Sequence, residues 1–147
     1  MNILLIEDDT LKAERILDFL SDFADGDKIC HERSYNTGLR SALLSQPSLI
    51  VLDMTLPTYD VGAKSREGRS RTMGGVDLMR KLKLKGVKLP VIVVSQFTTF
   101  GEGPDMIEFA DLMEQCTSEF PGASLRAFDT VHHQTRGWPS CALKSKV

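Results

Sequence analysis

Polar side chains end three apolar runs of the sequence. The runs NILLI, LIVL and VIVV are followed by Glu7 with Asp8, by Asp53 and by Ser95. Continuous apolar runs suit strands that are buried on both faces, as in a parallel sheet covered by helices. Because parallel strands place their carboxyl ends at one edge, we expect these side chains to share one crevice. Taken singly, an acid after a strand can also be an ordinary turn residue.

Such a crevice predicts phosphoryl chemistry. Several carboxylates in one place repel one another, and a divalent cation relieves that repulsion. A ligand set made only of oxygens favours Mg²⁺ over zinc. Beside such an ion Asp53 can attack a phosphoryl group, and the Ser95 hydroxyl can then donate to a phosphoryl oxygen. The acyl phosphate adds negative charge that can draw Ser95 and its loop inward.

The elements that must position these residues alternate along the chain. Strands are predicted at residues 2–6, 28–33, 49–52, 91–95 and 123–131. Helices are predicted between them, at residues 10–24, from Ser34 or Asn36 to before Pro47, at 76–85 and at 105–120. This order predicts an α/β fold, a doubly wound five-stranded parallel sheet with helices on both faces. In the flavodoxin-like order 2-1-3-4-5, the strands before Glu7, Asp53 and Ser95 are neighbours.

Two helices carry apolar residues at helical spacing, which predicts their buried faces. The first, capped by Asp9 or Thr10, is expected to bury Leu11, Ile16, Leu17, Leu20 and Phe23. The last is expected to bury Met106, Phe109, Leu112, Met113 and Cys116. Gly86 is expected to end the third helix.

Composition favours one globular domain covering residues 1–147. A net charge of −2 gives no general attraction to nucleic acid or anionic lipid. The three cysteines lie far apart without CxxC spacing, which fits a reducing compartment. The acidic N-terminal segment is unlike a signal peptide, and no apolar run is long enough for a membrane span. We therefore expect a cytoplasmic protein.

Two segments differ from the rest of the sequence. Residues 58–74 carry several glycines and the basic residues Lys64, Arg66, Arg69 and Arg71, and they predict a long basic loop inserted at the active edge. The loop is either a solvated insertion or a source of positive charge for the crevice or a partner. Residues 132–147 are expected to form an irregular C-terminal tail.

The segments NILLIEDD, LIVLDMTLP and VIVVSQF resemble the first, third and fourth strand motifs of response-regulator receiver domains. The resemblance covers residues 1–57 and 75–98 best. It implies that Asp53 is the phosphoacceptor and Ser95 the switch hydroxyl. It also implies an Mg²⁺ ion held by Asp8, by Asp53 and by the Met54 backbone carbonyl, with Glu7 acting mostly through water. Pro57 matches the proline that shapes the loop after the acceptor.

The sequence departs from the receiver pattern in the fifth strand. Receivers end this strand with a lysine that pairs with the phosphoryl oxygens, but the stretch GASLRAFDTVHH holds none. Asp129 falls near the lysine position, and Arg126 is the nearest basic residue. Three interpretations stay open. Arg126 or a tail lysine such as Lys144 substitutes, the site works slowly without a lysine, or phosphotransfer is lost.

The resemblance implies a stand-alone signalling receiver in a two-component system. A histidine kinase or a phosphotransfer protein would donate the phosphoryl group, and an unknown downstream protein would read the switch, with no nucleic acid or membrane partner. Such a protein is not an enzyme beyond its own phosphorylation and dephosphorylation. The alternative is a non-phosphorylated pseudo-receiver that serves as an interaction adaptor. A phosphatase with an Asp nucleophile ranks lower, because Thr55 stands where a second Asp is expected.

Overall fold

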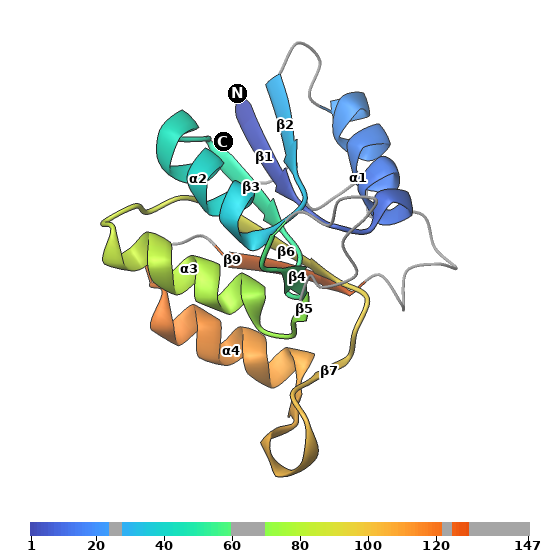
Figure 1. Cartoon of the computed structure of the whole chain (residues 1–147), viewed down its shortest axis with the longest axis vertical. Helices are drawn as coiled ribbons and strands as arrows, with labels where there is room; N and C mark the ends of the chain where they lie inside the picture. Colours follow the sequence, from blue (N-terminus) through green and yellow to red (C-terminus); the bar gives the residue numbers. More distant parts are fainter. Residues whose placement is uncertain (24–27, 60–69, 122–124, 130–147) are drawn as a thin grey trace.

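A parallel five-stranded sheet forms the centre of the protein (Figure 1). The computed structural model describes residues 1–23, 28–59, 70–121 and 125–129. The sheet order is β2-β1-β3-β6-β9, which is 2-1-3-4-5 when its strands are numbered along the chain, so the predicted order is confirmed. The strands are β1 (Asn2–Ile6), β2 (Lys28–Glu32), β3 (Leu49–Leu52), β6 (Val91–Ser95) and β9 (Leu125–Asp129).

Helices cover both faces of this sheet (Figure 1). Helix α1 (Thr10–Phe23) packs on the face that carries Ile3 and Leu5. The other face carries Leu4 and Ile6, and it meets α2 (Tyr35–Ser45), α3 (Gly74–Leu84) and α4 (Phe109–Glu119). Successive strand residues point to opposite faces. Both faces are therefore apolar, which explains why the strand sequences do not alternate. Among the described residues, no helix has the length and apolarity that crossing a membrane requires.

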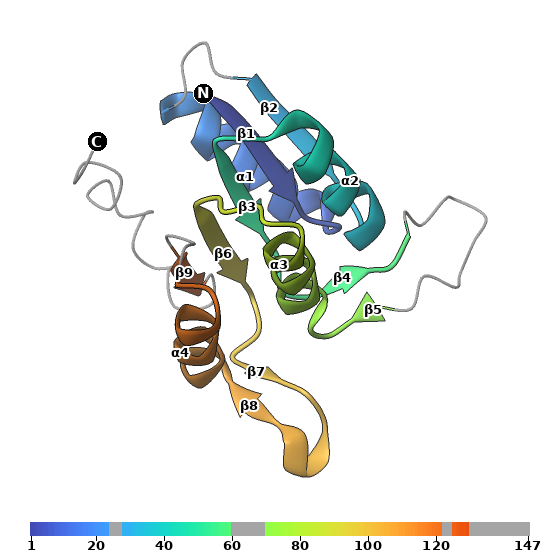
Figure 2. The ribbon, with the colours of Figure 1, turned by 90° about the vertical axis from the view of Figure 1, so that its left-hand side faces the viewer.

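Two small hairpins extend from the edge where the central strands end (Figure 2). In the first, β4 (Leu56–Pro57) pairs antiparallel with β5 (Ser70–Arg71), which joins the two ends of the predicted basic loop. Residues 60–69 of that loop, and the predicted tail 132–147, lie outside the described residues. In the second, β7 (Thr99–Phe100) pairs with β8 (Ile107–Glu108), and η1 (Gly103–Asp105) lies between them.

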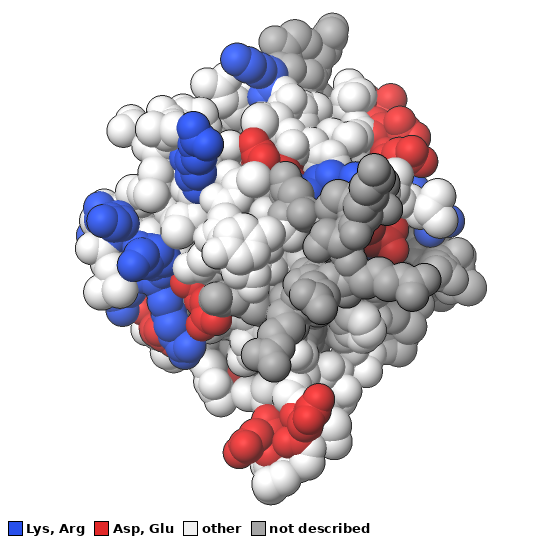
Figure 3. All heavy atoms as spheres, in the orientation of Figure 1, with Lys and Arg blue, Asp and Glu red and all other residues white. Residues whose placement is uncertain are grey.

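The face in Figure 3 carries both acidic and basic side chains. Acidic side chains gather at the tip of the β7–β8 hairpin, where Glu102 and Asp105 are exposed. Basic side chains gather near the end of α3, which carries the exposed Lys81, Lys83 and Lys85.

The predicted start of the last helix and the predicted buried face of the first turn of α1 need correction. Helix α4 begins at Phe109 and not at residue 105, because Ile107 and Glu108 pair with β7; Met106 is 60% exposed instead of buried. In α1, Leu11 is 69% exposed, whereas Lys12 is 9% exposed. Ile16 and Leu20 are buried as predicted. In the first turn of α1, the buried position is therefore occupied by the charged Lys12 and not by the apolar Leu11.

Two helix ends follow their predicted sequence signals. Ser34 caps α2, since its Oγ accepts the Thr37 N–H at 3.3 Å. Gly86, with φ of 72°, follows the end of α3, and the Val87 N–H donates to the Leu82 carbonyl at 3.0 Å. This is the Schellman arrangement, which favours glycine because the backbone is left-handed there.

A glycine brings α3 against the end of β3. The Gly75 N–H donates to the Met54 carbonyl at 2.9 Å. A Cβ placed on Gly75 would lie 2.7 Å from the backbone oxygen of Asp53 and 2.9 Å from the Met54 sulfur. A backbone oxygen cannot turn aside as a side chain can. Any larger residue at position 75 must therefore push α3 away from the residues that hold Asp53.

We expect Gly75→Ala to destabilise the protein by about 1–3 kcal/mol, the usual cost of overpacking. In an ordinary helix position the same change would stabilise, because alanine has the higher helix propensity. Urea unfolding followed by circular dichroism measures the difference. Leu84→Ala on the same helix, where the side chain is 81% exposed, is the control and should change stability by less than about 0.5 kcal/mol. A Gly75→Ala protein as stable as the control would contradict the close approach.

Candidate functional site

Three acids converge where the central strands end. Glu7 follows β1 and Asp53 follows β3, and these strands pair with Ile6 opposite Leu52. One oxygen from each of Glu7, Asp8 and Asp53 lies within 4.8 Å of the other two. Glu7 is 1% exposed and Asp53 is 4% exposed, while Asp8 is on the surface. We call these residues the acidic cluster.

A lysine that the sequence analysis missed lies inside the acidic cluster. The Lys12 ammonium is 2.6 Å from Glu7 Oε2 and 2.8 Å from Asp53 Oδ1. It also donates to the Val94 carbonyl at 3.3 Å. One signal could have pointed to it, namely a lysine in the first turn of a helix, where the helix dipole disfavours positive charge. The acids of the cluster provide a reason for that placement.

The cap of α1 determines where Lys12 lies. Asp9 is the capping residue, because its Oδ1 accepts the Lys12 N–H at 2.8 Å and its carbonyl accepts the Ala13 N–H at 2.9 Å. The Asp9 N–H in turn donates to Glu7 Oε1 at 3.0 Å. Glu7 thus uses one oxygen to hold the start of α1 and presents the other to the Lys12 ammonium.

Burial and charge shift the pKa values of the cluster in a consistent way. Burial, together with repulsion from Asp53, raises the pKa of Glu7 to about 7, although Lys12 opposes the shift. Burial also raises the pKa of Asp53, and Lys12 again opposes it. Burial lowers the pKa of Lys12, but attraction to Asp53 and Glu7 outweighs it and the net shift is upward. The lysine therefore stays charged and favours the ionised carboxylates beside it.

Side chains in and just after β2 contact the connection between β1 and α1. Arg33 Nη2 donates to the Asp8 carbonyl and to Thr10 Oγ1, both at 3.2 Å. His31 Nε2 lies 2.8 Å from the Glu7 carbonyl. His31 and Arg33 thus contact the backbone carbonyls of Glu7 and Asp8, and Arg33 also contacts the Thr10 hydroxyl.

Ser95 and Met54 are the other predicted site residues. Ser95 is fully buried at the end of β6; its Oγ accepts the Phe97 N–H at 3.1 Å and donates to the Phe97 carbonyl at 3.2 Å. The Met54 carbonyl, the predicted backbone ligand, accepts the hydrogen bond from Gly75. That carbonyl keeps one lone pair for a second partner. The roles of both residues stay predictions.

The fifth strand of the sheet, β9, ends beside Ser95. Asp129 pairs with Ser95 and is the last residue of β9, whereas the sequence analysis predicted a strand over residues 123–131. Arg126, one predicted replacement for the lysine, pairs with Ile92, three residues before that end. At about 3.3 Å per residue its backbone is roughly 10 Å from the edge. Lys144, the other candidate, lies outside the described residues.

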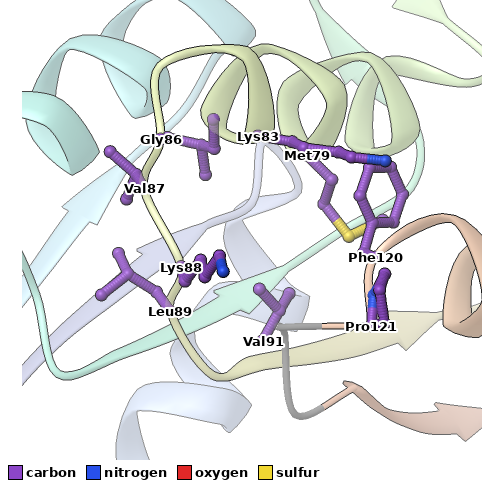
Figure 4. Close-up of a pocket in the computed structure, with 10 residues that line it drawn as sticks. Met79, Lys83, Gly86, Val87, Lys88, Leu89, Val91, Phe120 and Pro121 are labelled. Carbon is purple, nitrogen blue, oxygen red and sulfur yellow. The ribbon is translucent and has the colours of Figure 1, made fainter.

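An apolar hollow of about 220 Å³ lies away from the cluster, near the start of β6 (Figure 4). Its walls include Met79, Val87, Val91 and Phe120. Two contacts join α3 to α4 near it: Arg80 binds both Glu119 carboxylate oxygens at 2.7 and 3.0 Å, and Lys83 Nζ donates to the Glu119 carbonyl. The described residues that line the hollow are mostly apolar, with Lys83 and Lys88 as the charged ones and no carboxylate among them.

Comparison with known proteins points to one family, although no family model matches the sequence. The chain is 29% identical to the Detocs response regulatory protein DtcB of Enterobacter cloacae, over 96% of this chain and 95% of that protein. Among solved structures, the receiver domain of a Francisella response regulator superposes with a TM-score of 0.59 at 18% identity, covering 88% of this chain and 83% of that one.

The beryllofluoride-activated receiver domain of Klebsiella pneumoniae RstA gives a TM-score of 0.57 at 19% identity, covering 88% of this chain and 86% of that one. These structural likenesses establish the fold. The sequence likeness adds a response regulatory protein that aligns almost from end to end. The resemblance inferred from the strand motifs is confirmed: the chain is a response-regulator receiver in fold and resembles a response regulatory protein in sequence.

Proposed function

We propose that this protein is a phosphorylation-controlled signalling receiver whose Asp53 accepts a phosphoryl group. The observation that carries the proposal is the acidic cluster, in which a buried Asp53 lies with Glu7 and Asp8 at the carboxyl edge of the central strands. The similarity to a response regulatory protein supports it. A histidine kinase or a phosphotransfer protein would donate the phosphoryl group, and the signal would pass to a downstream protein by direct contact.

The residues of the cluster fit a divalent cation. They offer only oxygen ligands, and Glu7 Oε2 is buried without an aligned hydrogen bond among the described residues. Small numbers of carboxylates that leave room for waters suit Mg²⁺. Asp8, Asp53 and the Met54 carbonyl would hold the ion, with Glu7 acting through water. Once bound, the ion would neutralise charge on the transferring phosphoryl oxygens.

The residues of the chain would carry the transfer itself. An Asp53 oxygen attacks phosphorus and forms the new P–O bond, while the bond to the donor breaks and the leaving group keeps its electron pair. The Ser95 hydroxyl would then give up its hydrogen bond to the Phe97 carbonyl and donate to a phosphoryl oxygen instead. Because Ser95 and Phe97 share two hydrogen bonds, this exchange would move the segment between β6 and β7.

A pseudo-receiver is the second candidate, and one observation favours it. Asp53 already has a cationic partner in Lys12, so the cluster is partly neutralised without any added ion. A protein of this kind would act as an interaction adaptor in one fixed state. Phosphorylation of the purified protein separates the two candidates.

We expect the protein to gain the mass of one phosphoryl group when it is incubated with Mg²⁺ and acetyl phosphate. Asp53→Asn should abolish the gain, because an amide oxygen is a much weaker nucleophile than a carboxylate. Intact-protein mass spectrometry measures the product, and Asp105→Asn, which changes an exposed acid of the β7–β8 hairpin, is the control. Absence of any gain in the wild type would establish the pseudo-receiver, and equal gain in Asp53→Asn would place the acceptor elsewhere.

We expect Ser95→Ala to separate phosphorylation from switching. The variant should still accept the phosphoryl group, within about tenfold of the wild-type rate, since Ser95 is not the nucleophile. It should lose the change in backbone hydrogen exchange at residues 96–100 that phosphorylation produces in the wild type. Ser45→Ala, at an exposed position of α2, is the control. The same exchange response in Ser95→Ala and in the wild type would rule out the switch role.

A further inference from the structure

We propose that Lys12 is the fixed cation of the phosphorylation site. In this role it is the charge partner of Asp53, delivered by α1, and it competes with a divalent cation for the oxygens of the acidic cluster. The inference rests on the proposed function, because it assigns to Lys12 the pairing with phosphoryl oxygens that receivers give to a lysine after the fifth strand.

The Lys12 ammonium donates two hydrogen bonds and forms a close ion pair with Glu7. An ammonium group has three donors and no acceptor. Lys12 Nζ lies against three oxygens, from Glu7 at 2.6 Å, Asp53 at 2.8 Å and Val94 at 3.3 Å. These oxygens lie in or just after β1, β3 and β6, which are the three central strands of the sheet. The ammonium therefore joins the strands whose ends form the site.

Two other basic residues are candidate partners of the cluster. Arg33 donates to a backbone carbonyl and to a hydroxyl. Arg126 is three residues from the end of β9, and the residue that does end it is Asp129. Among the described residues, the ion pairs of Glu7 and Asp53 are therefore those with Lys12.

This position determines how Lys12 acts on phosphoryl transfer. Its ammonium touches Asp53 Oδ1, so a phosphoryl group bonded to Asp53 arrives within reach of the same donors. Lysine acts as a point charge on a flexible stem and can follow the added oxygens. It donates hydrogen bonds and loses no proton; the P–O bond forms at Asp53, and the donor's leaving group departs with its electron pair.

Through the same contacts, Lys12 would compete with a metal ion for the carboxylate oxygens. Glu7 and Asp53 each give one oxygen to the ammonium, and both oxygens belong to residues of the candidate cation site. A divalent cation there would lie a few ångströms from a fixed positive charge. We therefore expect the wild type to bind Mg²⁺ weakly and to fold stably without it.

Lys12→Gln tests the proposal, because glutamine keeps two N–H donors but carries no charge. We expect it to bind Mg²⁺ roughly tenfold or more tightly than the wild type, measured by isothermal titration calorimetry, since a nearby repulsive charge is gone. Its melting temperature in EDTA should fall and should recover when Mg²⁺ is added. Lys81→Gln, an exposed lysine of α3, is the matched control and should match the wild type in both measurements.

Phosphoryl uptake gives the second measurement. At saturating Mg²⁺, Lys12→Gln should take up the phosphoryl group from acetyl phosphate about tenfold to a hundredfold more slowly, as when one charge-stabilising donor is removed from a site. Lys12→Arg should recover part of the rate, because it restores the charge with a different shape. An unchanged rate in Lys12→Gln would overturn the role of Lys12 in phosphoryl transfer.

The measurements separate the failure of this inference from the failure of the proposed function. If the wild type takes up no phosphoryl group, the proposed function fails, but Mg²⁺ affinity and melting in EDTA still test Lys12. Unchanged or weaker Mg²⁺ binding by Lys12→Gln would overturn the competition. If Lys12→Gln does not fold, the double variant Lys12→Gln with Glu7→Gln removes one charge of each sign and should melt closer to the wild type. In that case, a double variant that also fails to fold in EDTA would overturn the inference.

Discussion

The contact between the Lys12 ammonium and the carboxylates of Glu7 and Asp53 is the constraint on which the site depends. Both acids are almost completely buried, and a buried charge is costly unless it is paired and hydrogen-bonded. The lysine supplies the opposite charge from a neighbouring helix. With these ion pairs in place, Glu7 and Asp53 can lie beside one another in a stable fold. Removing one partner alone would leave an uncompensated charge in the interior.

The sheet and its helices bring Lys12, Glu7 and Asp53 together. Parallel pairing places the ends of β1, β3 and β6 side by side, and the Asp9 cap fixes the first turn of α1 above them. On the other side, Gly75 lets α3 approach the backbone of Asp53 and Met54. The site is thus surrounded by regular elements whose positions depend on backbone contacts. Such support limits the freedom of the Asp53 side chain.

The origin of the positive charge separates this chain from the receiver pattern. Receivers carry a lysine after the fifth strand, whereas here that strand ends in Asp129 and an ammonium reaches the acids from α1. A point charge on a long flexible stem can reach one position from different elements, which a rigid planar group could not do as easily. The sources of positive charge that the sequence suggested were Arg126, a tail lysine and the basic loop, and none of them lies in α1.

The sequence by itself determined the order of the sheet, the convergence of Glu7, Asp8 and Asp53, and the ends of α2 and α3. These features follow from local signals, namely continuous apolar runs, capping residues and the shared edge of parallel strands. Only the tertiary structure decided the partner of Asp53. The apolar pattern of α1 placed Leu11 inward and gave Lys12 no role, because periodicity records hydrophobicity and not the attraction of a distant carboxylate. Asp53 is 41 residues from Lys12 along the chain, so their pairing appears only when β3 lies beside β1.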